Sequence, residues 1–394
     1  MHKREVVVVS GARTAIGSFG GSLKDQSPSD LAARLVAEVV RRAGVDAHSV
    51  GQCVFGNVIH SEPADMYLGR VAALKGGLSE QTPGLTVNRL CGSGLQAIVS
   101  AAQQIELGVC DTAVAGGAES MSRAPYWLQS ARFGQRMGNG EMVDAMTSAL
   151  HCPMESIHMG VTAENLAQKY GISREDQDAL AVESHRRGQR ATEEGRFAGQ
   201  ILPIELKSRK GAQVFETDEH VRQNCEVADM AKLKPVFRRD GSVTAGNASG
   251  LNDAAAAVLL MDREKARAEG REVLGRLVDY SVVGVEPKYM GIGPVPAIRE
   301  ILARNHLAVG DIDVFEVNEA FAAQALSVAR ELELPADRLN PNGSGVGLGH
   351  PIGATGAVIT VKALYELKRV QGRYAMVSLC IGGGQGIAAL FERD

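Results

Sequence analysis

Two cysteines stand at the start of glycine-rich segments, where a thiol could do chemistry. Cys91 is followed by glycines at 92 and 94 ahead of a predicted helix, and Cys380 is followed by three glycines. Glycines let a bulky substrate approach a sulfur atom, and the positive end of a helix favours a thiolate. Cys91 is therefore a candidate nucleophile, although a cysteine that only packs beside a turn fits the pattern equally well. Cys380 is a candidate nucleophile, or an acid/base with a pKa near neutrality.

A histidine and an asparagine could complete such a site. His350 lies in a glycine-rich segment whose spacing fails the dinucleotide pattern G-x-G-x-x-G, and the chain has no Walker A pattern. A positioned base is therefore favoured over a nucleotide loop. Asn318 precedes a predicted helix, so its local pattern favours a plain N-cap. The alternative is an amide aimed at the reacting atoms, as in Cys-His-Asn catalysis.

The six cysteines are too widely spaced for a metal or redox motif. No two of them form C-x-x-C, which excludes zinc ribbons and thioredoxin-like sites. We therefore expect free thiols and no metal centre.

Apolar strands alternate with amphipathic helices in the segments that position these residues. Strands are expected at 6–9, 53–59, 85–90, 112–115, 314–317 and 375–379, with Cys91 ending the third of them. Helices are expected at 29–42, 319–331 and 354–368, and another begins at Ser173. This alternation predicts an α/β fold.

Two parts of the chain share one outline, and a third part differs from both. Residues 91–117 and 350–383 each read as a glycine-rich start, a helix, and a strand that ends in glycines. This suggests a duplicated α/β unit whose two helix N-termini meet at a shared centre. Between about 121 and 248, charged and turn residues are denser, and short strands are expected at 201–206 and 214–217 around Lys210-Gly211. We interpret this stretch as an inserted, surface-exposed domain.

Composition excludes several classes of protein. The chain has 394 residues, 45% of them hydrophobic and 22% charged, with a net charge of −4 and 4% aromatics. Nucleic-acid binding is a poor interpretation, because neither a basic field nor many stacking platforms are present. The longest apolar run, 254–261, is far below the roughly 20 residues that a membrane helix needs. With no signal-peptide pattern, we expect a cytoplasmic protein without membrane partners.

Seven segments taken together resemble the signatures of the thiolase family, in the order in which thiolases carry them. They are residues 13–15, 88–94, 158–165, 245–250, 318–322, 349–356 and 380–386. The resemblance spans essentially the whole chain and is nearest to bacterial β-ketothiolases of the polyhydroxyalkanoate type.

The resemblance implies a fold and an assembly. The fold would be the thiolase fold, with two similar α/β halves in a five-layer αβαβα stack and an inserted loop domain. The N-terminal half would comprise 1–120 and 251–272, the insert 121–250, and the C-terminal half 273–394. The insert would supply coenzyme A (CoA) and oligomer contacts, and the protein would be a homo-oligomer, most simply a tetramer.

The resemblance also implies a reaction, in which acyl-CoA and acetyl-CoA form a 3-ketoacyl-CoA plus CoA, or the reverse, for short to medium acyl chains. Cys91 matches the nucleophile that carries the acyl group, and His350 matches its base. Cys380 matches the acid/base that takes the α-proton of acetyl-CoA. Asn318 matches the residue that holds a water in the enolate oxyanion hole, with His350 contributing. The backbone N–H groups of Cys91 and Gly382 match the second oxyanion hole, for the tetrahedral intermediate.

The same resemblance implies a binding site for CoA thioesters, which would be substrates, with no permanently bound cofactor. Arg222 corresponds to a family position beside the adenosine moiety of CoA. Ser249 and His158 correspond to positions along the pantetheine arm. The pocket wall corresponds to Met159, Met290 and Phe321. For the two methionines, core filling is the alternative.

Three other functions compete with this interpretation. A decarboxylating condensing enzyme of the ketoacyl synthase type shares the fold but would lack a second cysteine at Cys380. A catalytically silent, thiolase-like lipid-binding protein would lack the full Cys-His-Cys-Asn set. A Rossmann oxidoreductase fails on the spacing of the glycines.

Overall fold

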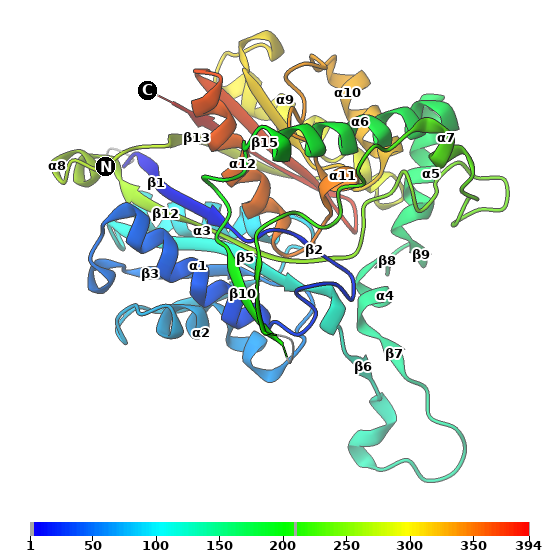
Figure 1. Ribbon diagram of the computed structural model, residues 1–394, viewed down its shortest axis with the longest axis horizontal. Coiled ribbons are helices and arrows are strands. Elements are labelled where there is room, and N and C mark those ends of the chain that lie inside the picture. Colours follow the sequence, from blue (N-terminus) through cyan, green and yellow to red (C-terminus); the bar gives the residue numbers. More distant parts are fainter. Residues whose placement is uncertain (1–3, 209–210, 394) are drawn as a thin grey trace.

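The structure of the protein, a computed structural model, describes residues 4–208 and 211–393. Its main strands are β1 (Val6–Arg13), β2 (Gly17–Ser18), β3 (Gln52–Gly56), β4 (Gly84–Val87), β5 (Thr112–Ser120), β12 (Asn252–Asp262), β13 (Gly275–Gly284), β14 (Val314–Val317), β15 (Tyr374–Ile381) and β16 (Gln385–Glu392). They form one ten-stranded sheet in the order β14-β15-β16-β13-β1-β12-β5-β3-β4, with β2 paired to β12 (Figure 1).

The pairing directions divide this sheet into two similar halves. In the first, β4, β3 and β5 are parallel, and β5 is antiparallel to β12. In the second, β14 and β15 are parallel, and β15 is antiparallel to β16. An antiparallel contact between β1 and β13 joins the halves. The duplicated α/β unit expected from the sequence is confirmed.

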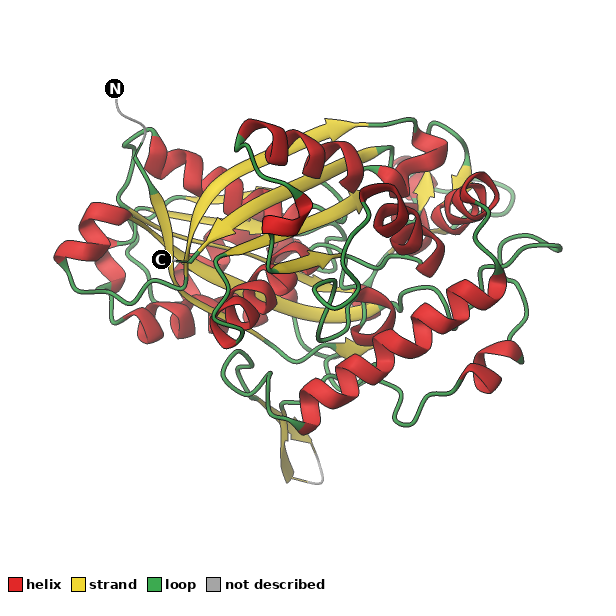
Figure 2. Cartoon of the chain, turned by 90° about the horizontal axis from the view of Figure 1, so that it is seen from above, coloured by secondary structure: helices red, strands yellow, loops and turns green. Residues whose placement is uncertain are grey.

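Helices cover both faces of each half and give five layers (Figures 1 and 2). The central pair, α3 (Ser93–Glu106) and α12 (Thr355–Arg369), contacts the strands of both halves. The outer face of the first half is covered by α1 (Pro28–Ala43) and α2 (Leu68–Lys75). The outer face of the second half is covered by α9 (Pro294–Arg304) and α10 (Ala322–Leu332).

The N-termini of α3 and α12 meet at the centre of the molecule, where only glycine leaves enough room. A Cβ atom on Gly94 would lie 2.6 Å from the backbone nitrogen of Ala357. A Cβ atom on Gly356 would collide in the same way with the backbone nitrogen of Leu95. Since Cys91 and His350 shortly precede these two helices, the close approach brings both residues to one place.

The sequence explains the best-formed elements directly. The continuous apolar run 254–261 belongs to β12, which is buried between β1 and β5, as expected for a strand covered on both faces. The apolar positions of α1 are buried, and the helix ends at Gly44 in the left-handed conformation (φ 63°).

Three predicted boundaries near the site differ from the structure. The strand expected at 53–59 ends at Gly56, and the strand expected at 85–90 ends at Val87. The helix expected at 319–331 begins at Ala322. In each case the residues nearest the site are in turns or extended segments, because tertiary contacts take their backbone out of the regular element.

Between β5 and β12, the described residues add no strand to the large sheet. The α-helices and strands here are β6 (Tyr126–Trp127), β7 (Val143–Asp144), α4 (Ala145–Ala149), β8 (His151–Cys152), β9 (Ile157–His158), α5 (Met159–Tyr170), α6 (Arg174–Glu193), β10 (Ile204–Ser208), β11 (Gly211–Phe215) and α7 (Val227–Ala231), with short 3₁₀ helices at Met121–Arg123 and Gln129–Phe133. The two strands expected around Lys210-Gly211 are β10 and β11, each displaced by about three residues; Lys210 itself lies outside the described residues. Figure 1 shows β6 and β7 on an arm that projects from the body.

A buried ion pair ties this segment to the sheet. The Arg13 guanidinium donates from both terminal nitrogens to the Asp218 carboxylate, at 2.7 and 2.9 Å, and both side chains are fully buried. The Asp218 carboxylate also accepts the backbone N–H of Ile16 at 2.8 Å. These bonds place the chain near residue 218 against the end of β1.

None of the helices in the described part of the chain is long and apolar enough to cross a membrane. Within the same residues, no group of three or more histidine, cysteine, aspartate or glutamate side chains could hold a metal ion.

Candidate active site

A pocket of about 350 Å³ lies where the two halves and the 121–251 segment meet. Its walls are mostly apolar, and each of the three parts contributes to them. The lining residues are Leu90 and Cys91; Met121, Ala149, Leu150, His158, Met159, Val236, Phe237, Thr244, Ala245, Ala248, Ser249, Gly250 and Leu251; and Met290, Ala320, Phe321, His350, Ile352 and Gly382. A pocket of this kind suits an acyl chain with a few polar groups at its reactive end.

Cys91 reaches the pocket from a tight turn rather than from the end of a strand. Leu90 has a left-handed backbone (φ 45°), and its N–H donates to the Asn88 side chain at 2.9 Å. The Ser93 hydroxyl accepts the N–H of Arg89 at 2.8 Å and donates to the Leu90 carbonyl at 2.7 Å. The prediction that Cys91 ends a strand is therefore wrong. A branched residue in this backbone region stores strain, which recurs where a side chain is held for function.

The surroundings of Cys91 favour the protonated thiol. Burial raises its pKa to about 11. The nearby backbone N–H groups of Gly382 and Cys91 act in the opposite direction and lower the pKa of the thiol, but by less than burial raises it. Burial therefore opposes the effect of the helix N-terminus, which favours a thiolate. The thiol needs a base.

His350 is that candidate base, and it is held on two sides. Its backbone N–H donates to the Asn252 side-chain oxygen at 2.9 Å, and its Nδ1 lies 2.7 Å from the Thr355 hydroxyl oxygen. Gly349, in the left-handed region (φ 106°), lets the chain turn into this position. Burial lowers the pKa of His350 to about 4, so the ring is neutral at neutral pH and can accept a proton.

Asn318 lies beside the His350 ring. The Asn318 Nδ2 atom is 3.5 Å from Nδ1 and 3.4 Å from Nε2, so the amide faces the ring rather than one nitrogen. Helix α10 begins at Ala322, with Phe321 as its N-cap, which contradicts the local N-cap interpretation of Asn318. The buried Oδ1 atom of Asn318 has no hydrogen-bond partner among the described residues.

Cys380 is fully buried on β15, behind the pocket wall. It belongs to an apolar cluster that includes Met159, Met290 and Phe321. Burial, followed by the neighbouring Cys91, raises the pKa of Cys380 above its ordinary value. Burial therefore works against a pKa near neutrality, and the sequence carries no measure of this desolvation.

Comparison with known proteins identifies the family of this chain. Residues 6–264 match the family model of the thiolase N-terminal domain, and residues 271–393 match that of the thiolase C-terminal domain. The chain belongs to the thiolase family. The predictions of a thiolase and of the thiolase fold are confirmed, and the synthase-type alternative is not favoured.

Individual relatives match this thiolase over nearly its whole length. It is 63% identical to Beta-ketothiolase BktB of Cupriavidus necator over 391 residues, which cover 99% of each chain. The solved acetyl-CoA acetyltransferase of Bacillus anthracis superposes with a TM-score of 0.97 at 49% identity, covering 99% of both chains. Human mitochondrial 3-ketoacyl-CoA thiolase in complex with CoA gives 0.96 at 42% identity, covering 99% of this chain and 98% of the human chain.

Most of the predicted CoA-binding residues of this thiolase gather in the pocket. The one exception is Arg222, whose side chain is exposed outside the pocket, with Nη1 4.0 Å from the Met230 sulfur. The five residues that line the pocket are Ser249, His158, Met159, Met290 and Phe321. A site for the distal, adenosine end of CoA would lie outside the pocket in any case.

His158 presents one defined face to the pocket. Its ring stacks on Phe237, with centroids 4.6 Å apart, and its Nδ1 accepts the N–H of Gly160 at 3.0 Å. Burial and the neighbouring His151 lower the pKa of His158 to about 4. The ring is therefore neutral and carries its hydrogen on Nε2.

The two predicted methionines fill the core and line the pocket at once. Met159 and Met290 are both buried in the cluster that contains Cys380, and both contribute to the pocket surface. The two interpretations left open by the sequence are thus compatible.

Sequence reasoning missed Glu119, a buried carboxylate at the end of β5. Its oxygens accept the Asn57 amide and the backbone N–H groups of Val58, Ile59 and Gly353, at 2.9–3.1 Å. It therefore ties the end of β3 to the segment that carries His350. Burial raises the pKa of Glu119 to about 8. The only signal in the sequence is one acidic residue among the small residues of a buried strand.

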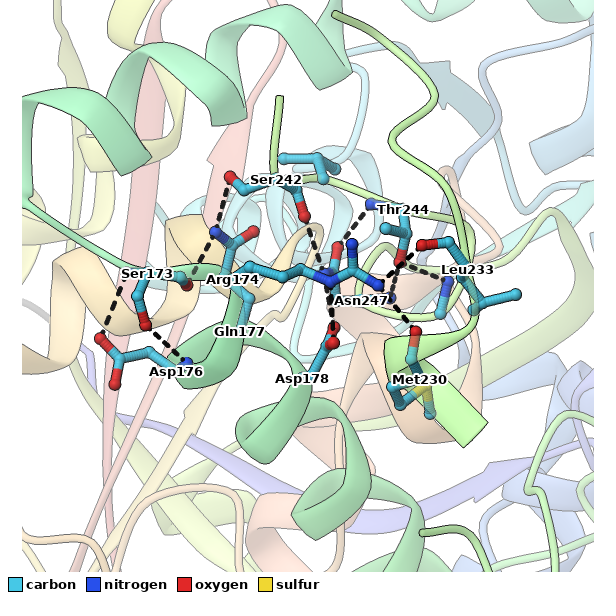
Figure 3. A network of polar contacts seen from close by, with 12 residues as sticks. Ser173, Arg174, Asp176, Gln177, Asp178, Met230, Leu233, Ser242, Thr244 and Asn247 are labelled. Carbon is cyan, nitrogen blue, oxygen red and sulfur yellow. Dashed lines mark hydrogen bonds and ion pairs between the residues drawn. The ribbon is translucent and has the colours of Figure 1, made fainter. Parts of the chain in front are cut away.

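A polar network, also missed, supports one wall of the pocket (Figure 3). Arg174 pairs with Asp178 at 2.7 Å and donates to the backbone carbonyls of Met230 and Leu233 at 2.7 and 2.9 Å. Asp178 in turn accepts the side-chain amide of Asn247 at 2.9 Å. Helix α6 thus holds both ends of the 230–247 loop, which lines the pocket.

Proposed function

We propose that this thiolase catalyses the reversible Claisen condensation of an acyl-CoA with acetyl-CoA through an acyl-Cys91 intermediate. One observation carries the proposal. Cys91, His350 and Gly382, from three distant segments, converge on one apolar pocket. The reactions named for the relatives, β-ketothiolase and acetyl-CoA acetyltransferase, support the same chemistry.

In the first half-reaction, neutral His350 takes the proton of Cys91 as the sulfur attacks the thioester carbonyl. The backbone N–H groups of Cys91 and Gly382 would serve as the oxyanion hole for the tetrahedral intermediate, since both residues line the pocket in which it forms. The bond to the CoA sulfur breaks, and that sulfur takes the proton of Cys380. This leaves an acyl-Cys91, a His350 imidazolium and a Cys380 thiolate.

In the second half-reaction, the Cys380 thiolate takes the α-proton of acetyl-CoA. A thiol with a raised pKa becomes a strong base once it has lost its proton, so burial suits Cys380 to this step. The resulting enolate attacks the acyl carbon, and a carbon–carbon bond replaces the bond to Cys91. The Cys91 sulfur recovers its proton from His350, which restores the starting state of all three groups.

Asn318, through a bound water, and His350 would together stabilise the enolate oxygen. The buried Oδ1 of Asn318 has no partner among the described residues, so it can accept a hydrogen from a bound water. Such a water would present its other hydrogen to the enolate. Each preorganised donor of this kind contributes about 3 kcal/mol to the transition state.

Initial-rate kinetics test the proposed function. With 3-ketoacyl-CoA and CoA both varied, thiolysis should give parallel lines in double-reciprocal plots, because the acyl group rests on the enzyme between the two half-reactions. A series of 3-ketoacyl chain lengths should favour short to medium chains, which suit an apolar pocket of about 350 Å³. Intersecting lines would contradict an acyl-enzyme intermediate.

Arg222→Ala should raise the KM for CoA by about tenfold with little change in kcat. The residue lies outside the pocket, so it can contact only a remote, non-reacting part of CoA. The matched control is Arg267→Ala, since Arg267 is also exposed but lies on α8 (Arg263–Ala268), at the opposite end of the molecule from α7 (Figure 1). Equal KM values for the two variants would show that Arg222 does not bind CoA.

The remaining parts of the proposal concern assembly and location. The arm around β6 and β7 exposes Phe133 and Met137, each to 94%, along with Tyr126 and Trp127. Apolar side chains grouped on a projecting arm are typical of an interface. We therefore propose a homo-oligomer, with a cytoplasmic tetramer as the expected form, that uses CoA thioesters as substrates without a permanent cofactor.

A further inference from the structure

The Thr355 hydroxyl makes two short contacts but has one hydrogen. Thr355 is buried at the first position of α12. Its Oγ1 atom lies 2.7 Å from Nδ1 of His350 and 2.9 Å from the carbonyl oxygen of Pro351. A hydroxyl can donate its one hydrogen to only one of these two atoms, so at the other atom it can only accept a hydrogen.

Only one arrangement makes both contacts hydrogen bonds. If the hydroxyl donated to Nδ1, two oxygens with no hydrogen between them would face each other at 2.9 Å. If it donates to the Pro351 carbonyl, its lone pair is free to accept a hydrogen from Nδ1 of His350. The bond from a threonine at a helix start to the carbonyl four residues earlier is also a common local pattern.

We propose that Thr355 is a positioning residue that holds neutral His350 with its hydrogen on Nδ1, leaving Nε2 as the base. This rests on the role proposed above for His350. The neighbouring Asn318 amide cannot select the tautomer, because it is nearly equidistant from both ring nitrogens. The same Thr355 bond persists when Nε2 gains the Cys91 proton, and it then supports the imidazolium.

Hydrogen bonds around Thr355 fix the turn that carries both Thr355 and His350, and this helps Thr355 to hold one tautomer of the ring. The backbone of His350 is fixed by Asn252, and Glu119 holds the N–H of Gly353 at 2.9 Å. The ring and the hydroxyl are therefore parts of one rigid turn, and little rotamer freedom is lost when they bond. A base with the wrong nitrogen protonated cannot accept the thiol proton, and such an error is costly in Ser-His-Asp enzymes.

Thr355→Val and Thr355→Ser test the proposal, with Thr360→Val as a matched control. Valine has the shape of threonine without the hydroxyl, whereas serine restores it. Thr360 is buried on the same helix and makes the same type of bond, to the Gly356 carbonyl at 2.7 Å, but does not contact His350. We measure kcat and the KM for CoA in thiolysis, the rate of Cys91 alkylation by iodoacetamide at pH 7, and the melting temperature.

We expect Thr355→Val to lower kcat and the Cys91 alkylation rate by about 10–100-fold, without a comparable change in the KM for CoA. Thr355→Ser should recover most of both rates, and Thr360→Val should keep them near those of the parent. Parent-like rates in Thr355→Val would overturn the proposal, as would equal losses in the serine variant or in Thr360→Val. If Thr355→Val does not fold, the serine variant and Thr355→Ala give the same comparison.

The alkylation rate separates this inference from the proposed function. It reports how well His350 takes the Cys91 proton and needs no turnover of CoA thioesters. A parent enzyme that acquires no acetyl group on Cys91 would refute the acyl-enzyme mechanism. If the Cys91 alkylation rate is unchanged when the Thr355 hydroxyl is removed, only the role of Thr355 is refuted.

Discussion

Replacing Cys91 by alanine should abolish both thiolysis and condensation, with rates lowered by at least about 10⁴-fold. Cys91 is the thiol that lines the pocket among the described residues, so we expect the acyl group to be carried there and not on another cysteine. The oxyanion-hole donors remain in the variant, but without a nucleophile they have no tetrahedral intermediate to stabilise.

Mass spectrometry of the intact protein checks this expectation. After brief exposure to acetyl-CoA, the parent chain should gain one acetyl group that maps to Cys91, and the alanine variant should gain none. Cys53→Ala is a suitable control, since Cys53 is fully buried on β3 and is not part of the pocket. An acetyl group that maps to Cys380 instead would reverse the two roles.

Replacing Cys380 by serine should separate the two half-reactions. A serine hydroxyl has nearly the size of the thiol, but its pKa is far higher, so it cannot become the base that takes the α-proton. Exchange of the acetyl-CoA methyl protons with deuterated solvent should therefore fall by about 10²–10⁴-fold. Acyl transfer to Cys91 should survive in part, because a CoA thiolate is stable enough near neutral pH to leave without a proton from Cys380.

The measurements are deuterium incorporation into acetyl-CoA and transfer of a radiolabelled acyl group to the protein. Cys152→Ser is the matched control, because Cys152 is equally buried and belongs to the same apolar cluster. Both rates should stay near the parent values in that control. If Cys380→Ser exchanges protons at the parent rate, Cys380 is a structural thiol, and His350 is the only base of the site.

Features that depend on near neighbours in the chain were predictable from the sequence. The alternation of strands and helices, the buried strand 254–261 and the repeated unit all appear in the structure. Regular elements are predictable because their patterns repeat every two or 3.6 residues and reflect which side faces the core. The surroundings of Cys91 and His350 were also predictable in part. The glycines next to these residues indicate that two segments pack closely, and the N-termini of α3 and α12 do so.

The roles of single residues next to these elements were harder to predict. Asn318 has the local pattern of an N-cap, yet it lies beside His350 and the helix starts at Ala322. Residues 88–90 have the pattern of a strand, yet they form the turn that carries Cys91. At both places, contacts with distant segments override the local preference, because a buried polar group must satisfy its hydrogen bonds wherever partners exist.

The sequence alone determined the family and the α/β layering, and it singled out Cys91, His350 and Cys380 as candidate reacting side chains, since these features are carried by residue types and short spacings. Only the tertiary structure decided their protonation. Burial raises the pKa of Cys91 and Cys380 and lowers that of His350, because it removes the water that would stabilise their charged forms. The tertiary structure also decided which residues hold the segment of His350 in place: Thr355 contacts the His350 ring, and Glu119 accepts the N–H of Gly353. Desolvation and long-range hydrogen bonds depend on which distant segments meet, and no local pattern records that.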